Sequence, residues 1–580
     1  MALRAGIVRS LAAVVLIVAV PRRTVDPEPS RTDPLQEAKR LAWLYNWAEA
    51  AQVLRRSGFK PTDEAAAVFS EAAEIRGNIE STSLPEAAKE IASLLTSLPA
   101  RRDVQLRLEL LAIKGDIEYQ YNLPAAQKTW EEAKQLAATT GLSQWEARSE
   151  GELGTIAFLN GEVFTATKLV TEAFLKAELS GDVAARIRYC TDLGEGFAEY
   201  GRSADAIRFF NKALGLAAAT PGAYFPFTAY LGKARLLATN GHEGEGLRML
   251  RNALDEAHVK NLRVREAKTL TVLGELESAK GRREEAIASL TSAADVAQSA
   301  GLDLIEADAS SALASLLRDV GRADGAEDYA RRSVAAAERA GDLYHLPQLT
   351  AVLAEIEENN GNLARAEADY SRATDLVGAL LKGFPQPRNK NILVATMGRV
   401  YQGHFDLAIN RSKDLARAFE ILESARAYGL VDVLREPTGA RRHLSVLDAD
   451  LAPKIAAVNR DLSHAQDLGL RNRLLDHLWE LEIQALHPHE LSASSYARPV
   501  SLHQFQSCLS EGDLAIEYTL ESSHSFALAI TRNRIVRYEL KGRAQLEASA
   551  DCFWLRCAKD VNHVQNPRRS MIWCSSQSRF

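Results

Sequence analysis

Glycine recurs every 40 residues through the middle of this chain, and that period constrains the fold more than any other feature. It is held six times, at Gly161, Gly201, Gly241, Gly281, Gly321 and Gly361. Other small residues keep the same register. Five positions after each glycine come Ala166, Ala206, Gly246, Ala286, Ala326 and Ala366, and seven positions before come Gly154, Gly194, Ala234, Gly274, Ala314 and Ala354. Several columns of small residues in one register indicate an array of internal repeats.

The spacing of these columns predicts a helix–turn–helix unit. Each glycine separates two segments with helical periodicity, and glycine readily adopts the positive φ that ends a helix. A second break follows about twenty residues later, for example at Gly181 and Gly301. Small side chains on both helices allow close approach, while Phe210 and Leu290 fill the remaining space. One helix pair cannot bury its apolar face alone, whereas a stack of pairs can.

This pattern resembles the tetratricopeptide repeat (TPR), which carries a Leu-Gly pair in its first helix and two alanines in its second. The clearest copy is LGELESAKGRREEAIASLTSAADVAQSAG, from Leu273 to Gly301. The usual repeat has about 34 residues, so longer helices are expected here. The resemblance implies a mainly α fold, with a TPR-like α-solenoid over residues 105–380. An ordinary helical bundle with alanine-rich packing is the alternative.

The first hundred residues show no clear repeat columns. Residues 1–20 place Arg4 and Arg9 before the apolar run LAAVVLIVAV, which suits an export signal better than a spanning helix. We expect an export signal or a membrane anchor through residues 4–20, hence an exported or membrane-anchored protein. A plain N-terminal helix of a cytoplasmic protein and a misassigned start are the alternatives. Residues 21–34 predict a linker, and residues 35–104 predict irregular helices.

The C-terminal third departs from the repeat. Two prolines in LKGFPQPRNK end the array, and residues 411–490 predict a helical hairpin because the glycine register is lost. LAIEYTL, SFALAIT and RIVRYEL then have the length and composition of three strands. The sequence therefore predicts an incomplete α/β module after the hairpin.

Two stretches in this region, AFEILESARAYGLVDVL and ARPVSLHQFQSCLSEGDLAIEYTLESSHSFALAITRNRIVRYEL, resemble the start of a CHAT domain. This caspase-like module is often found behind TPR arrays in bacteria, and residues 500–548 would be its first part. In that family a catalytic His and a catalytic Cys follow much later, but only 34 residues follow Leu546. We interpret residues 549–580 as an abnormal end: a frameshift, a broken gene or a degenerate domain.

Cysteine and histidine patterns provide no identifiable catalytic pair. Cys552, Cys557, His563 and Cys574 lie in the abnormal tail, where an unstructured tail is weighed against a metal site or a relic catalytic pair. The spacing is looser than the tight pairs that zinc sites use. We therefore assign no catalytic residue, no metal and no cofactor. A net charge of −6 gives no basic footprint for nucleic acid.

The concave side of the array is the candidate binding site. Counted from Gly154 and its equivalents, residues six before, three before, one after and four after should face a groove. These positions predict a partner-binding groove of Arg148, Arg188, Thr191, Glu195, Arg235, Lys268, Thr271, Glu275, Arg318 and Glu358. Its N-terminal end would be basic and would suit an acidic or carboxylate-bearing segment, since guanidinium groups grip carboxylates. Plain solvated surface charge is the alternative.

These features favour a protein–protein interaction scaffold or sensor. It would bind a protein or peptide in the groove and be coupled to a CHAT-like module that lacks its catalytic part. The alternative function is a CHAT-type cysteine peptidase whose catalytic half is missing from this chain. A third is a chaperone-type adaptor that binds C-terminal carboxylates through Arg148 and Arg188.

Overall fold

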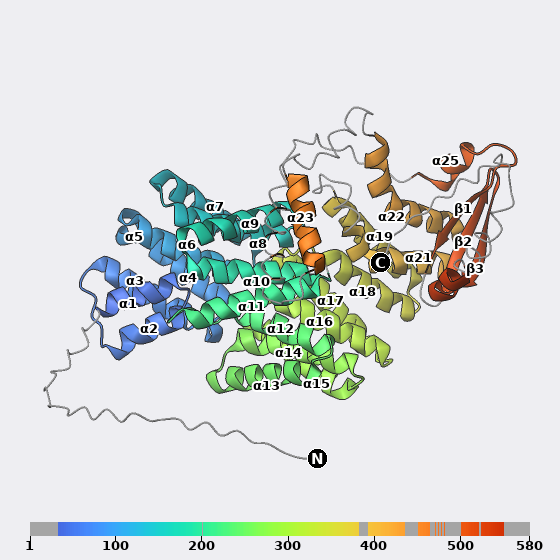
Figure 1. Cartoon of the computed structure of the whole chain (residues 1–580). Helices are drawn as coiled ribbons and strands as arrows, with labels where there is room; N and C mark the ends of the chain where they lie inside the picture. Colours follow the sequence, from blue (N-terminus) through green and yellow to red (C-terminus); the bar gives the residue numbers. More distant parts are fainter. Residues whose placement is uncertain are drawn as a thin grey trace, which may run out of the picture.

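The computed structural model describes residues 33–199, 201–381, 393–435, 451–464, 500–520 and 524–549, together with single residues at 470, 474, 477 and 481. The predictions for residues 1–32 and 550–580 lie outside these ranges. The described chain is mainly helical, with a small antiparallel sheet near its C-terminal end (Figure 1). The predicted fold class, a helical-repeat solenoid followed by a short β-segment, is confirmed.

The described residues begin with six short elements that precede the regular repeats. They are α1 (Pro34–Trp43), α2 (Trp47–Arg56), α3 (Glu64–Gly77), the 3-10 turn η1 (Ile79–Ser81), α4 (Leu84–Leu95) and α5 (Leu98–Arg102). Side-chain caps set several of their starts: Asp63 accepts from the Ala66 amide and Asn46 from the Glu49 amide. Such caps satisfy donors that the first turn of a helix leaves unpaired.

Seven antiparallel helix pairs then follow in the described residues. Each pair consists of a first helix, which lies on the inner side of the array, and a second helix. The pairs are α6 (Val104–Glu118) with α7 (Leu123–Thr140), α8 (Ser143–Leu159) with α9 (Val163–Ser180), α10 (Val183–Glu199) with α11 (Ser203–Ala219), α12 (Phe227–Thr239) with α13 (Glu243–Lys260), α14 (Arg263–Ala279) with α15 (Arg283–Ala300), α16 (Asp303–Asp319) with α17 (Ala323–Ala340), and α18 (Leu346–Asn359) with α19 (Leu363–Leu381).

The glycines of the 40-residue period form the turns inside these pairs. Their φ angles lie between 68° and 92°, a region that residues with a Cβ adopt only with strain. Tyr45 takes the corresponding place between α1 and α2, with φ 58°, so the first hairpin uses the same turn without the glycine. The column of small residues seven positions before each of these glycines is equally constrained, because a Cβ on Gly194 would lie 2.5 Å from the ring of Phe210.

The superhelix winds back on itself, so repeats far apart in sequence touch. One apolar cluster joins Leu84 and Ile91 of α4 to Ala297 of α15 and Ile305 of α16. The amide of Tyr224 donates to the Leu44 carbonyl at 3.1 Å, across 180 residues of sequence. In Figure 1 the blue N-terminal helices accordingly lie beside the green helices of the middle repeats. The array is thus a coil closed by contacts between its N-terminal helices and its middle repeats, with the first helix of each pair on its inner side.

The C-terminal part packs on the end of the coil. It comprises α21 (Gly398–Asp406), the π-helical η2 (Leu407–Ser412), α22 (Leu415–Arg435), α23 (Leu451–His464), α25 (Leu502–Ser507), β1 (Ala515–Thr519), β2 (His524–Thr531) and β3 (Arg534–Lys541). The strands pair in the order β1-β2-β3. Phe526, Leu528 and Ile530 of β2 join a core with α19, α21 and α22. Among the described residues, no helix has both the length and the apolar character that crossing a bilayer requires.

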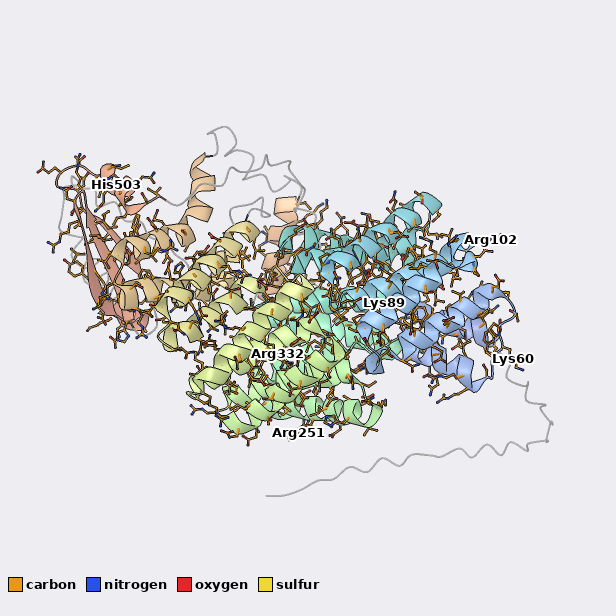
Figure 2. All side chains as sticks on the ribbon, turned by 180° about the vertical axis from the view of Figure 1, so that it is seen from behind. Lys60, Lys89, Arg102, Arg251, Arg332 and His503 are labelled. Carbon is orange, nitrogen blue, oxygen red and sulfur yellow. The ribbon has the colours of Figure 1, made fainter. Side chains whose placement is uncertain are left out.

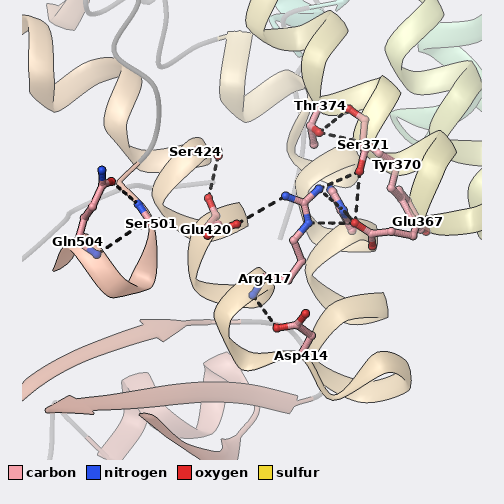
Figure 3. Close-up of polar contacts among 11 residues, drawn as sticks. Glu367, Tyr370, Ser371, Thr374, Asp414, Arg417, Glu420, Ser424, Ser501 and Gln504 are labelled. Carbon is pink, nitrogen blue, oxygen red and sulfur yellow. Dashed lines mark hydrogen bonds and ion pairs between the residues drawn. The ribbon is translucent and has the colours of Figure 1, made fainter. Parts of the chain in front are cut away.

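A polar network fixes this C-terminal part to the last repeat (Figure 3). Arg417 of α22 donates from Nε to Glu367 Oε1 of α19 at 2.9 Å, and from Nη2 to Ser371 Oγ at 2.8 Å. His404 of α21 is buried, lies 3.1 Å from the same Glu367 oxygen and stacks on the ring of Tyr370. Three helices therefore meet on one carboxylate, which favours a defined orientation of the sheet relative to the solenoid.

Candidate functional site

The first helices of successive pairs lie side by side and present one continuous inner face. We define the inner face as the surfaces of α6, α8, α10, α12, α14 and α16 that point into the coil. Polar contacts run between neighbouring helices along it: Thr155 Oγ1 of α8 donates to Asp192 Oδ2 of α10 at 3.1 Å. Arg235 of α12 forms an ion pair with Glu275 of α14. These contacts occur between helices of adjacent repeats, as the predicted groove requires.

Groups from different parts of the coil come close together on its inner side. Burial raises the pKa of Tyr119, at the end of α6, and nearby carboxylates act in the same direction. Those carboxylates include Glu195 of α10 and Asp342, which lies before α18. The early and late repeats do meet, since the amide of Tyr344 donates to the Leu159 carbonyl at 2.9 Å and the Phe158 and Tyr344 rings are in contact.

Three carboxylates on the inner face are exposed to solvent and lack a hydrogen bond or ion pair with any other described residue. They are Glu195 and Glu199 of α10 and Asp308 of α16. We call them the acidic cluster. The pKa of Glu195 is raised to about 7, chiefly because protein surrounds it; the charge of Lys268 lowers it, and the charges of Asp192, Glu199 and Asp308 raise it.

The pKa of Asp308 is raised as well. Its pKa is raised to about 6, first by burial and then by the charges of Asp342 and Glu275, while His345 and Arg235 lower it. A side chain on the floor of a concave surface can be wetted by solvent and still be surrounded by protein. The acidic cluster is therefore accessible and crowded, and the charges of Lys268 and His345 only partly offset the rise in these pKa values.

The sequence predicts that Arg148 faces the inner side of the coil, but its side chain does not. Its side chain is 1% exposed, and its Nε and Nη2 donate to Asp182 Oδ2 and Oδ1 at 2.7 and 2.8 Å. Nη2 also donates to the Trp43 carbonyl at 2.9 Å, and the guanidinium lies 3.5 Å from the Trp43 ring centroid. The first hairpin covers it, so Arg148 is enclosed by protein and cannot reach a ligand in this state.

The other predicted arginines are neutralised within the protein. Arg188 contacts Glu152 and lies 3.1 Å from Asp116, and Arg235 is paired with Glu275. Burial raises the pKa of Glu152 to about 8, and its Oε1 has no hydrogen-bond partner. The row of arginines therefore meets a matching set of acids, and the predicted basic end of the groove does not present free positive charge.

The remaining predicted residues are either packed in the helices or partly exposed and in contact with another side chain. Thr191 and Thr271 are both 7% exposed and donate to carbonyls of their own helices, so they belong to the packing. Lys268 is partly exposed and makes a long contact of 3.4 Å with Thr228. Arg318 pairs with Glu355, whereas Glu358 faces Arg411 of the C-terminal part at 3.5 Å.

Sequence reasoning did not name Asp308, Glu199 and His345. Asp308 lies six positions before Ala314 and so satisfies the rule that selected Arg148 and Lys268; the signal was present. Glu199 and His345 fall outside the four counted positions. They reach the inner face because α10 continues to residue 199 and because the turn before α18 bends inward, where His345 Nδ1 lies 2.7 Å from Asp342 Oδ2.

No thiol chemistry or metal site is evident in the described part of the chain. Cys190 is buried, which raises its pKa to about 12 and keeps the thiol protonated. Cys508 is exposed and lies 3.4 Å from the Gln504 carbonyl. No group of three His, Cys, Asp or Glu side chains in the described ranges could hold a metal ion. The other cysteines lie outside those ranges.

Several labelled basic side chains lie far apart on the molecule. Figure 2 shows Lys60, Arg102, Arg251 and His503 at separate places around the body, on elements far apart in the chain. No single basic surface is formed by these labelled residues.

The fold is that of a TPR-like helical repeat. No family model matches the chain, and no curated protein sequence matches it. Solved structures with a similar fold include a Rap protein complexed with competence and sporulation factor, which is 15% identical, with 65% of this chain and 98% of that chain covered and a TM-score of 0.28.

Two further structures share this likeness. A STAND-class signal transduction ATPase with a TPR sensor, from Pyrococcus horikoshii, is 14% identical over 68% of this chain and 53% of its own, with a TM-score of 0.33. Human IFIT1, solved as a dimer with m7Gppp-AAAA, is 12% identical over 79% of this chain and 96% of its own, with a TM-score of 0.37. Likenesses this distant carry no argument about what the present chain binds.

Proposed function

We propose that this protein is an interaction scaffold whose inner face binds a positively charged segment of a partner protein. The observation that carries the proposal is the acidic cluster: three exposed carboxylates, from α10 and α16, with no partner among the described residues. A lysine or arginine side chain entering between these helices would add positive charge to that of Lys268 and His345 and could bond directly to these carboxylates. It would also relieve the mutual repulsion that raises the pKa of Glu195.

The structure favours a cationic ligand over the acidic one that the sequence suggested. A carboxylate-binding groove needs free guanidinium groups, but Arg148 and Arg188 already have carboxylate partners. Displacing Asp182 from Arg148 would leave a buried charge unpaired, which is costly. Each contact of a ligand cation with the exposed acidic cluster would contribute on the order of 1 kcal/mol and weaken with salt.

Coupling to a CHAT-like module stays a proposal that rests on the resemblance. In its favour, α22, α25 and the three strands follow in the order expected of the first part of that domain. We assign this part a structural role at the end of the scaffold. The alternative, a cysteine peptidase, would need a thiolate and a histidine base in contact. The cysteines and histidine that the sequence offers for this, between Cys552 and Cys574, lie outside the described residues.

A fluorescent hexalysine peptide tests the binding proposal, with hexaglutamate of the same length as the control ligand. We expect hexalysine to bind the full chain at low salt, and the double variant Glu195→Gln, Asp308→Asn to bind at least tenfold more weakly. Glu285→Gln, an exposed carboxylate on the second helix α15, is the matched control and should bind like the parent. Preference for hexaglutamate, or equal binding by all three proteins, would remove the acidic cluster as the site.

A further inference from the structure

The turn that joins α1 to α2 docks on the inner side of the coil. We call residues 43–46 the docked turn. Two donors bind its backbone: Arg148 Nη2 donates to the Trp43 carbonyl at 2.9 Å, and the amide of Tyr224 donates to the Leu44 carbonyl at 3.1 Å. Both donors are at least 105 residues away in the sequence. The body of the coil therefore binds the main chain of this short segment as it would bind a peptide.

Two aromatic side chains of the docked turn contact aromatic side chains of the body. The rings of Trp43 and Trp145 meet edge to face with centroids 5.3 Å apart, and those of Tyr45 and Tyr224 do so at 5.8 Å. The Arg148 guanidinium lies 3.5 Å from the Trp43 ring centroid and 4.7 Å from that of Tyr45. Edge-to-face and cation–π contacts add to binding beyond the area that they bury. One arginine thus contacts a carbonyl and two rings of the same segment.

The connection between α11 and α12 is shaped to receive the docked turn. We call its residues 220–226 the seat. The carbonyls of Pro221 and Gly222 accept hydrogen bonds, both of 3.1 Å, from Arg40 Nη1 and Asn46 Nδ2. Gly222 has φ 84°, and a Cβ there would lie 2.7 Å from a side-chain carbon of α1. A residue with a Cβ would therefore be strained and would collide with the hairpin.

The seat interrupts the regular repeat. Between α9 and α10 the connection has only two residues, and α10 starts at Val183. One repeat later α12 starts at Phe227, about one helical turn late in the 40-residue period. Pro221 and Pro226 disfavour a helix in the residues just before them. The array therefore loses a helical turn at the place where the docked turn binds.

The docked conformation carries two unfavourable features, both on Tyr45. Its φ of 58° lies in the left-handed region, which a bulky side chain adopts only with strain, and later hairpins have glycine there, as at Gly161. Its hydroxyl is buried and has no hydrogen-bond partner among the described residues. Release of the turn would relax the backbone and expose the hydroxyl to water. Strain of this kind is concentrated at ligand sites and switches.

A second contact across the coil lacks these features. Tyr344 follows Tyr224 by three repeats, and its amide donates to the Leu159 carbonyl at 2.9 Å. Leu159 ends α8, and the turn after it has Gly161 at the position of positive φ. Tyr344 is fully buried, with its ring centroid 4.4 Å from that of Phe158. This contact is therefore the reference for a junction that stays closed.

We propose that Arg148, Trp145, Tyr224 and the seat form a peptide-binding site, which the docked turn occupies in the free protein as an autoinhibitory element. A partner segment with two aromatic side chains one residue apart would bind there once the turn leaves. Arg148 keeps its partner Asp182 in both states, so no unpaired buried charge results. This site is separate from the acidic cluster, and the proposal does not depend on what that cluster binds. While the turn is docked, other ligands reach only the middle repeats.

Hydrogen exchange of single amides in the full chain, followed by mass spectrometry, tests whether the turn leaves its site. We expect the Tyr224 amide to exchange at least about tenfold faster than the Tyr344 amide. Arg40→Met removes a bond to the seat and should speed exchange at Tyr224 at least about threefold without affecting Tyr344. Arg40→Gln keeps a donor and should have a smaller effect. The matched control is Arg56→Met on α2, whose side chain is 69% exposed and which should change neither amide.

A fluorescent peptide that copies residues 40–48, RLAWLYNWA, tests whether the site accepts this segment from another molecule. Its control has alanine in place of the copies of Trp43 and Tyr45. In anisotropy measurements the peptide should bind Arg40→Met more tightly than the parent, because it competes with the docked turn. The control should bind at least about tenfold more weakly. Equal protection of the Tyr224 and Tyr344 amides, equal binding of both peptides, or peptide binding that Arg40→Met leaves unchanged would overturn the proposal.

Discussion

Replacement of Arg148 by methionine probes the contact that closes the coil. The guanidinium makes two hydrogen bonds to Asp182 and one to the Trp43 carbonyl, and both side chains of the ion pair are at most 3% exposed. Methionine retains apolar contact with Trp43 but leaves the carboxylate buried without its partner. Removing one member of a buried pair costs about 3–5 kcal/mol. Asp182 keeps one contact, the Ala185 amide at 3.2 Å, so we expect about 3–4 kcal/mol.

A double-mutant cycle separates the pair from general packing. Asp182→Ser keeps a side-chain acceptor at the start of α10 and removes the charge. We expect the double variant Arg148→Met, Asp182→Ser to be more stable than Arg148→Met alone, with a coupling energy of about 2 kcal/mol or more. The matched control is Arg251→Met, an exposed arginine on α13, which should change the free energy of unfolding by less than about 0.5 kcal/mol.

Urea unfolding followed by tryptophan fluorescence is the measurement, because Trp43 and Trp145 both lie within 6 Å of the Arg148 guanidinium and report on this region. Two results would refute the reasoning. One is a cost below about 1 kcal/mol for Arg148→Met. The other is strict additivity of the two single changes, which would mean that the ion pair does not stabilise the closed coil.

Four further outcomes are expected. Ala286→Leu should lower the free energy of unfolding by about 1–3 kcal/mol, seen as a lower melting temperature, because Ala286 is fully buried where α14 and α15 meet. Tyr45→Phe should raise the free energy of unfolding by about 1 kcal/mol, seen as a higher urea midpoint, because the Tyr45 hydroxyl is buried without a partner. Glu195 and Asp308 have raised pKa values in the folded state, of about 7 and about 6, so their ionisation lowers stability as pH rises from about 4 through those values. The same ionisation should strengthen hexalysine binding between pH 5.5 and 8 at constant salt, and Glu195→Gln should flatten that profile.

The repeat architecture was predictable because its constraints are local. A turn that needs positive φ selects glycine. Two helices that pack too closely for a large side chain between them select glycine or alanine. Both constraints are therefore visible in the sequence. Gly274 shows this directly, since an added Cβ would lie 2.6 Å from Leu290 of the paired helix. The three strands were predicted for the same reason, from alternation and β-branched content within short segments.

The electrostatics of the inner face was not predictable in this way. Arg148 and Asp182 are 34 residues apart, and Arg188 and Asp116 are 72 apart, so each arginine meets its acid only after successive repeats stack. Helix-face spacing identifies which charged residues face the groove, but it does not identify the residues on other helices that neutralise them. The winding of the coil, set by contacts such as Leu44 with Tyr224, decides which charges remain free.

One column of the repeat shows how this winding moves the binding surface. Six positions before the small residue, α8 has Arg148, α14 has Lys268 and α16 has Asp308, three residues equivalent by sequence. Arg148 is buried beneath the Trp43–Tyr45 turn, Lys268 is partly exposed, and Asp308 is exposed. The difference follows from the first hairpin, which covers the inner side of α8 and leaves α14 and α16 uncovered. A ligand should therefore contact the middle repeats, where α10 and α16 hold the acidic cluster, and not the N-terminal end.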